Sequence, residues 1–218
     1  MVPFDLQPRV LSVPLGPRDS AIVLSDGRGD GAQALIERIE EEIPGLVEGC
    51  YVESVPLAEI ARLSPYFLLI QEDVVVPPQL VRSIRGLVLR QQTGWFPEFN
   101  GRDAVEWALY RHRANRIGST IRLVTGESTG DPMLSRGAAT IPEDATPHNC
   151  VMRAKRLGIE LMVDVVRDAL TSDELLMFDA PTPAATTTGR LGVVRRAVMA
   201  ASFLQGWLAR EASESRRY

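Results

Sequence analysis

Hydrophobic and polar residues follow two periods along the first ninety positions of the chain. Short apolar runs, typical of buried strands, are separated by segments that carry apolar residues at helical spacing. The alternation of the two predicts an α/β unit with a largely parallel sheet. The expected strands cover residues 9–17, 21–31 (running into a turn), 49–55 and 66–70, and the expected helices cover residues 32–43, 57–63 and 78–92.

The pattern is less regular beyond residue 93. We expect a helix within 103–116, a strand over 120–126, and a functional loop over the turn-rich segment 127–149, which is long for a structureless connection. A helix over 150–158, which Gly158 would end, a strand over 159–166, a linker over 179–189 and a C-terminal helix over 190–218 complete the predicted order.

The predicted architecture is therefore Rossmann-like, with a mostly parallel central sheet flanked by helices. We expect one α/β domain over residues 1–178, divided near residue 92 into two halves, and followed by the linker and the C-terminal helix.

Composition agrees with a globular protein. Of the 218 residues, 45% are hydrophobic and 24% are charged, and the mean hydropathy is -0.02. The formal net charge of -4 excludes a broad basic surface of the kind that dominates nucleic-acid binding. Lys155 is the only lysine, and every other basic side chain apart from the two histidines is an arginine. We attribute this imbalance mainly to coding bias, although arginine forks also suit phosphates.

Cysteine usage and hydropathy indicate a location. Cys50 and Cys150 are the only cysteines and lie far apart in the sequence, so no disulfide framework is expected. No signal-like N-terminal segment and no apolar run long enough to span a bilayer is visible. The prediction is a cytoplasmic protein without a membrane span.

Acidic pairs are the candidate chemistry that remains after other motifs are excluded. The chain has no phosphate-binding glycine loop, no Cys/His metal cluster and no nucleophile elbow, and it has only two histidines. Glu72 and Asp73 follow the apolar run 66–70, and ligands bind outside the carboxyl ends of parallel strands. Glu143 and Asp144 form the second pair.

Two segments carry a resemblance to a known family. "SPYFLLIQEDVVVPPQLV" and "GAATIPEDATPHNCVMRAKRLG" resemble the two acidic motifs of glycosyltransferases with the GT-A fold. The resemblance implies that Asp73 binds Mg²⁺ or Mn²⁺ against the diphosphate of a nucleotide-sugar donor such as UDP-glucose, with Glu72 as a helper. Gln71 stands where an aspartate is usual.

The second motif implies the catalytic machinery. Asp144 matches the catalytic base that activates a hydroxyl acceptor, with Glu143 beside it, and His148 is a candidate metal ligand in a stretch longer than the family's. Arg18 is a candidate phosphate clamp because guanidinium groups bind phosphates bidentately. The expected function is sugar transfer to a hydroxyl group, with a hydroxylated base in modified DNA as one candidate acceptor. The resemblance implies that residues 1–92 bind the nucleotide sugar and that residues 93–178 bind the acceptor.

Two alternatives stay open. A nucleotidyltransferase on a related α/β scaffold would use the same acids and a metal, but would bind a nucleoside triphosphate. A non-enzymatic interaction module would carry Glu72, Asp73, Glu143 and Asp144 only as loop or helix-start acids, and His148 as a surface residue.

Overall fold

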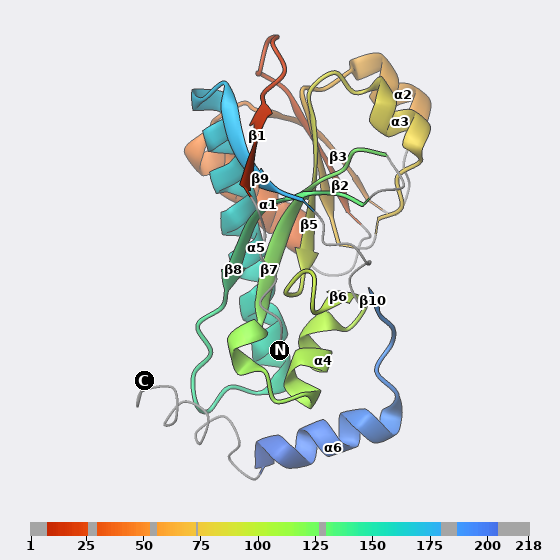
Figure 1. Ribbon diagram of the computed structural model, residues 1–218. Coiled ribbons are helices and arrows are strands. Elements are labelled where there is room, and N and C mark those ends of the chain that lie inside the picture. Colours follow the sequence, from red (N-terminus) through yellow and green to blue (C-terminus); the bar gives the residue numbers. More distant parts are fainter. Residues whose placement is uncertain are drawn as a thin grey trace.

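The computed structural model describes residues 8–25, 30–52, 56–72, 74–126, 130–179 and 187–204, and is built around one mixed sheet (Figure 1). Eight strands lie in the order β1-β9-β8-β7-β5-β4-β2-β3. Their bounds are β1 Pro8–Ser12, β2 Ala21–Ser25, β3 Val47–Val52, β4 Phe67–Gln71, β5 Leu87–Thr93, β7 Gly118–Leu123, β8 Met133–Ala138 and β9 Glu174–Phe178.

The sheet is parallel in one half and antiparallel in the other. β3, β2, β4 and β5 run parallel to their neighbours, whereas β5, β7, β8, β9 and β1 pair in antiparallel fashion. The Rossmann-like α/β class is therefore confirmed, but the expectation of a mostly parallel sheet holds only up to β5. From β5 onward the chain returns directly from strand to strand, which antiparallel pairing permits without a crossover helix.

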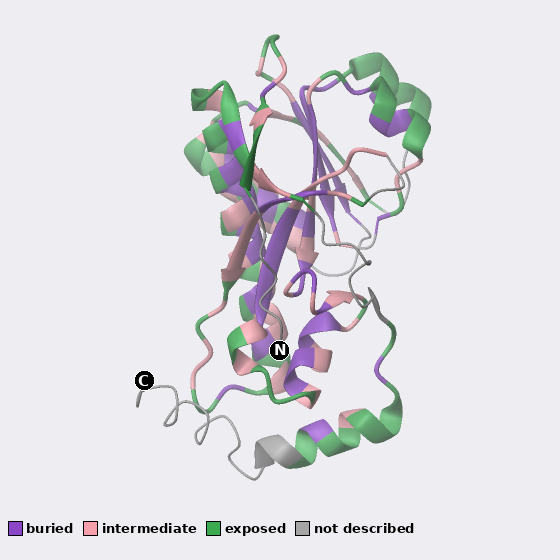
Figure 2. Cartoon of the chain, viewed as in Figure 1, coloured by how far each residue is buried: buried purple, intermediate pink, exposed green. Residues whose placement is uncertain are grey.

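Helices cover both faces of the parallel half. α1 (Gly31–Glu42) and α5 (Pro147–Thr171) pack on one face, and α2 (Leu57–Leu63) and α3 (Pro78–Ser83) pack on the other. In β4, Phe67 and Leu69 face α1 and α5, whereas Leu68 and Ile70 face α2 and α3. All five residues of β4 are buried, as expected of a strand covered on both sides. Figure 2 shows that the middle of the sheet is largely buried.

A smaller group of elements lies beyond the carboxyl end of β5. It contains α4 (Ala104–Tyr110), the 3₁₀ turn η1 (Ala114–Arg116), the short parallel pair β6 (Asn100–Gly101) and β10 (Thr187–Thr188), and α6 (Val193–Leu204), which lies along α4 (Figure 1). Phe99, Leu109, Leu191 and Met199 belong to its buried cluster, together with Cys150 of α5. Among the described residues, no helix is both long and apolar enough to cross a bilayer.

The expected helix over 78–92 is wrong in its second half. α3 ends at Ser83, and the chain enters β5 at Leu87. Gly86 lies against the backbone at the start of β4, where a Cβ atom would stand 2.0 Å from the carbonyl oxygen of Tyr66. Along β5, the buried residues Leu89 and Gln91 alternate with the half-buried residues Arg90 and Gln92. This two-residue period is that of a strand.

The predicted strand over 159–166 is also wrong, because these residues form the middle of α5. Its buried residues recur three or four positions apart along the helix: Cys150, Ala154, Gly158, Met162, Val165 and Ala169. Gly158 does not end the helix. A Cβ atom there would stand 2.4 Å from Nε2 of Gln91 and 2.9 Å from Oγ of Ser119, so glycine lets α5 approach the sheet.

Other boundaries shift by smaller amounts. The loop expected over 127–149 contains β8, and the helix expected within 103–116 is divided into α4 and η1. The first strand is β1, which ends at Ser12, before the segment Val13–Pro17. Most of the predicted linker, 180–186, and the end of the expected C-terminal helix, 205–218, lie outside the described residues.

Candidate active site at the carboxyl edge of the parallel strands

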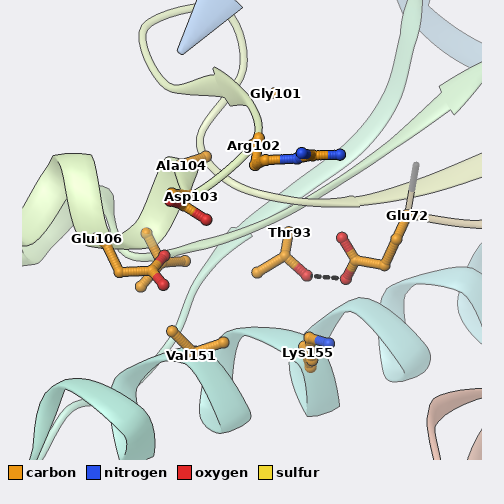
Figure 3. Close-up of a pocket in the computed structure, with 10 residues that line it drawn as sticks. Glu72, Thr93, Gly101, Arg102, Asp103, Ala104, Glu106, Val151 and Lys155 are labelled. Atoms are coloured by element: carbon orange, nitrogen blue, oxygen red, sulfur yellow. Dashed lines mark hydrogen bonds between the residues drawn. The ribbon is translucent and has the colours of Figure 1, made fainter. Parts of the chain in front are cut away.

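A polar pocket of about 190 Å³ opens where β4 and β5 end (Figure 3). Glu72 directly follows β4, Thr93 ends β5, and Val151 and Lys155 project from α5 on the opposite wall. The remaining wall comes from the start of α4 and the residues before it: Gly101, Arg102, Asp103, Ala104, Val105 and Glu106. The pocket thus lies at the strand edge where ligands of open α/β sheets bind.

Glu72 is fixed in the pocket by backbone and side-chain contacts. Its φ of 53° lies in the left-handed region, and its N–H donates to the carbonyl oxygen of Gln91 at 2.9 Å. The hydroxyl of Thr93, which is 8% exposed, donates to the Glu72 carboxylate. The carboxylate of Glu72 is therefore held at the mouth of the pocket rather than free in solvent (Figure 3).

Glu106 is a partly desolvated acid on the other side of the pocket. Burial raises the pKa of its carboxyl group above the usual value of 4.5, and the nearby negative charge of Asp103 acts in the same direction. The positive charges of Arg196 and Lys155 oppose this rise in the pKa. Only 19% of the Glu106 side chain is exposed. A carboxyl group whose pKa is raised in this way is a stronger base than an exposed glutamate, which suits it to accept a proton from a bound ligand.

Asp103 links the pocket to the C-terminal helix. Its Oδ2 accepts hydrogen bonds from the backbone N–H of Leu191 at 2.9 Å and from Arg196 of α6 at 2.5 Å. Arg196 also approaches Oε1 of Glu106, at 3.8 Å. The indole N–H of Trp107 donates to the carbonyl oxygen of Gly189 at 2.7 Å, which adds a second attachment. Residues 187–204 therefore brace the α4 wall.

Replacing Arg196 by methionine is expected to loosen this attachment. The ion pair with Asp103 is partly exposed on the arginine side, so we expect a loss of roughly 1 kcal/mol in the local opening free energy of 187–204. Amide hydrogen exchange should quicken in α6 and stay unchanged in α5. Arg190→Met, at an exposed position just before α6, is the matched control. Equal exchange in the two variants would contradict a bracing role for Arg196.

Lys155 and Glu72 also line a second, much smaller cavity of about 20 Å³. Its other residues come from the ends of β2 and β4, the start of α1, and the face of α5 that meets β5: Ser25, Gly31, Gln71, Gln91 and Ile159. Gln71 is 4% exposed and donates from Nε2 to the carbonyl oxygen of Gly31 at 2.8 Å. The polar site therefore extends from α4 to the carboxyl end of β2.

The structure separates the residues that the sequence predicted as one site. Glu72 lines both cavities, and Asp73 lies outside the described residues. Arg18 precedes β2 and so lies at the opposite, amino edge of the sheet. There it donates to the carbonyl oxygens of Ala169 and Ser172 at 2.8 and 2.9 Å and pairs with Asp173 at 2.7 Å, which ties down the end of α5.

Glu143, Asp144 and His148 are exposed near the start of α5, and none of them lines either cavity. Within the described parts of the chain, no group of three or more His, Cys, Asp and Glu side chains could hold a metal ion. Glu143, Asp144 and His148 therefore lie apart from the two cavities that Glu72 lines.

Sequence reasoning missed Thr93, Asp103, Glu106 and Lys155 as pocket residues. Lys155 had a signal, since it is the only lysine in the chain, but that signal was attributed to coding bias. Asp103 and Glu106 meet Lys155 only because α4 and α5 pack together, which no local pattern shows.

Comparison with known proteins supplies the fold. No protein-family model and no curated protein matches the sequence. Among solved structures, the chain is similar to a likely sugar N-formyltransferase from Mycobacterium tuberculosis, with 13% identity, a TM-score of 0.62, and coverage of 85% of this chain and 87% of that one. It is also similar to glycinamide ribonucleotide transformylase 1 from Symbiobacterium toebii, with 19% identity, a TM-score of 0.54, and coverage of 70% and 88%.

A third similar structure is HypX from Aquifex aeolicus in complex with tetrahydrofolic acid, with 14% identity and a TM-score of 0.62. That match covers 81% of this chain but only 30% of HypX. At such identities the likeness shows the fold and not the activity.

These neighbours correct the earlier interpretation. The resemblance to GT-A-fold glycosyltransferases is wrong, because the similar solved structures include several formyltransferases, whose fold differs from GT-A. The expected sugar transfer, the Mg²⁺ or Mn²⁺ cofactor, the UDP-glucose donor and the acceptor hydroxyl in modified DNA are wrong with it. The "QED" and "PED" motifs are too short to distinguish the two families. What the structure shows is an α/β protein of the formyltransferase type of fold.

Proposed function

We propose that this protein transfers a formyl group from a reduced-folate donor to an amine bound in the pocket at the end of β4 and β5. The observation that carries the proposal is the desolvated carboxyl group of Glu106, which faces this pocket at the ligand-binding edge of the sheet. The names of similar proteins support it, since several are formyltransferases and one holds tetrahydrofolic acid.

The proposed reaction requires a base. An amine that reaches the pocket as an ammonium ion must lose a proton before its nitrogen attacks the formyl carbon. Glu106 takes this proton, and its raised pKa brings its basicity closer to that of the amine. Attack forms a tetrahedral oxyanion, to which the guanidinium group of Arg102 offers hydrogen-bond donors from the pocket wall. The bond from the formyl carbon to the folate nitrogen then breaks, and that nitrogen receives the proton held by Glu106. The attacking nitrogen releases its second proton to solvent, so that one proton is liberated for each formyl group transferred.

Donor binding and transfer are tested on the unmodified protein. Thermal unfolding is followed with tetrahydrofolate, 10-formyltetrahydrofolate and, as a control, oxidised folic acid. A ligand at a hundred times its dissociation constant stabilises the native state by about 2.7 kcal/mol. The protein is then incubated with 10-formyltetrahydrofolate and a panel of amino sugars and amino acids, and the products are identified by mass spectrometry.

We expect stabilisation by the reduced folates and an amine that gains one formyl group. Release of formate without a formylated amine would show that the protein hydrolyses the donor, and it would overturn the proposal. The absence of both folate binding and product would overturn it as well.

A cytoplasmic location is part of the same proposal. Cys50 and Cys150 are both free thiols, and thiols stay reduced in the cytoplasm.

A further inference from the structure

Lys155, the only lysine of the chain, lies in an environment that is unusual for a charged side chain. It is half-buried on α5 and lies in the polar pocket between Glu72 and the α4 wall that carries Glu106 (Figure 3). In the described part of the structure, its ammonium group makes no hydrogen bond or ion pair. A half-buried charge without a partner is costly, so the free protein holds Lys155 ready for a ligand that supplies the missing interaction.

The backbone beneath Lys155 carries a second unsatisfied group. The carbonyl oxygen of Lys155 accepts a hydrogen bond from Nε2 of Gln91 at 3.3 Å, and this contact fixes the orientation of the Gln91 amide. The side chain of Gln91 is buried, with 2% of the residue exposed, and its Oε1 has no hydrogen-bond partner. Gln91 lines the small cavity that adjoins Lys155.

The volume of that cavity, about 20 Å³, is enough for one water molecule or one small polar group. An acceptor oxygen buried without a donor therefore marks a place for an N–H or O–H group from a ligand or from water. Two polar groups of residues that line this cavity, the ammonium of Lys155 and the amide oxygen of Gln91, thus lack partners among the described residues.

The α4 and α5 walls of the pocket form two regions of opposite charge, and the Glu72 carboxylate at the end of β4 accepts a hydrogen bond from Thr93. Arg196 contacts Asp103 at 2.5 Å but reaches Glu106 only at 3.8 Å, so Glu106 is the less closely paired acid of the α4 wall. Lys155 supplies positive charge on the α5 wall, and it lowers the pKa of Glu106 without forming an ion pair with it. A ligand that pairs with both regions must carry a positive and a negative group.

We propose that the acceptor is a small amine that also bears an anionic group, and that Lys155 binds this anion while Glu106 faces the amine. The inference rests on the function proposed above. It adds the class of acceptor, an amino acid or an amino-sugar phosphate, both of which present an oxyanion close to an amine. A charge-assisted hydrogen bond from Lys155 to that oxyanion is the interaction that selects it.

Binding of candidate acceptors, measured by calorimetry without any folate, tests the inference. Two pairs of probes differ only by the anionic group: glycinamide against glycine, and glucosamine against glucosamine 6-phosphate. The wild-type protein should bind the anionic member of one pair about 10- to 100-fold more tightly. Which pair shows the preference identifies the source of the anion, a carboxylate or a phosphate.

The variants are Lys155→Met, Lys155→Arg and a control, Arg156→Met, which removes an exposed positive charge from the next position of α5. Lys155→Met should abolish the preference for the anionic member, Lys155→Arg should retain most of it, and Arg156→Met should leave it unchanged. Circular dichroism confirms that each variant is folded before titration.

Three results would overturn the inference: no preference in the wild-type protein, a preference that survives in Lys155→Met, or equal losses in Lys155→Met and Arg156→Met. A merely structural lysine would change the melting temperature without changing the preference. Because no donor is present, a failure of formyl transfer and a failure of this inference are separate outcomes. Anion-dependent binding without transfer would refute the proposed reaction and leave the binding site standing.

Discussion

Replacing Glu106 by glutamine is expected to reduce the rate of formyl transfer by roughly 10²- to 10⁴-fold, the range that general acid–base catalysis supplies. Glutamine keeps the shape of the side chain and cannot accept the proton of the acceptor ammonium ion. Folate binding should be unchanged, because the substitution alters the acceptor side of the pocket. The measurement is single-turnover transfer from 10-formyltetrahydrofolate, with the folate affinity determined separately.

The pH dependence gives an independent check. Burial raises the pKa of the Glu106 carboxyl group above 4.5, so the wild-type rate should fall as the pH decreases through this raised value, and that limb should be absent in Glu106→Gln. The free energy of unfolding should change with pH in the opposite direction to the rate. A group with a raised pKa in the folded state binds protons more tightly there, so the wild-type protein loses stability as the pH rises from the unfolded to the folded pKa. Glu106→Gln should lack this loss.

Glu48→Gln is the matched control, because Glu48 is an exposed acid of β3 outside both cavities. It should leave the rate and its pH profile unchanged. A rate in Glu106→Gln within a few-fold of the wild-type rate would remove Glu106 from the reaction, and Glu72 would become the candidate base.

Most of the parallel half of the fold, up to α3, could be predicted because its signals are local. The apolar run of β4 and the helical spacing of α1 and α2 follow directly from residues that are adjacent in sequence. The same reasoning placed Glu72 at the carboxyl edge of a strand, where the structure has it. No knowledge of distant contacts was needed for either prediction.

The errors occur where a distant contact decides the conformation. Residues 159–166 are rich in valine and isoleucine and resemble a strand, but they continue a helix whose apolar face packs on the sheet. Gly158 looked like a helix end, and its actual role is visible only with Gln91 and Ser119 beside it. Secondary-structure propensity and helix-stop residues such as glycine are weak signals, and tertiary packing can override them.

The candidate site was harder to predict for the same reason. Glu72, Asp103, Glu106 and Lys155 come from three separate elements, and Asp103 is bound to Arg196, ninety-three positions away. A single sequence shows directly only which residues are adjacent along the chain, so it favours pairs of neighbouring acids as candidates. The pocket instead brings together single residues from distant elements, and the acid of Glu106 matters because of its burial, which the sequence does not display.

Replacing Gly86 by alanine is expected to destabilise the protein by at least about 3 kcal/mol, at the upper end of overpacking penalties. A Cβ atom at this position would stand 2.0 Å from the carbonyl oxygen of Tyr66, and 2.8 and 2.9 Å from its carbonyl carbon and Cα. These are backbone atoms, which no rotamer change can move away. The same carbonyl oxygen accepts the N–H of Leu87 at 2.8 Å, so relief of the clash must also disturb the first hydrogen bond between β4 and β5.

Thermal unfolding measures the effect, which for a domain of this size corresponds to a fall of about 6 to 12 °C in Tm. Gly49→Ala in β3 is the control, since its Cβ atom would meet only a ring carbon of Tyr51 at 3.8 Å. That substitution should be neutral or slightly stabilising, because alanine has less backbone freedom to lose on folding. Equal melting temperatures for the two variants would mean that β5 does not enter the sheet at Leu87. That result would favour the helix predicted through this segment, because the close approach of Gly86 to the backbone of Tyr66 exists only if β5 lies beside β4.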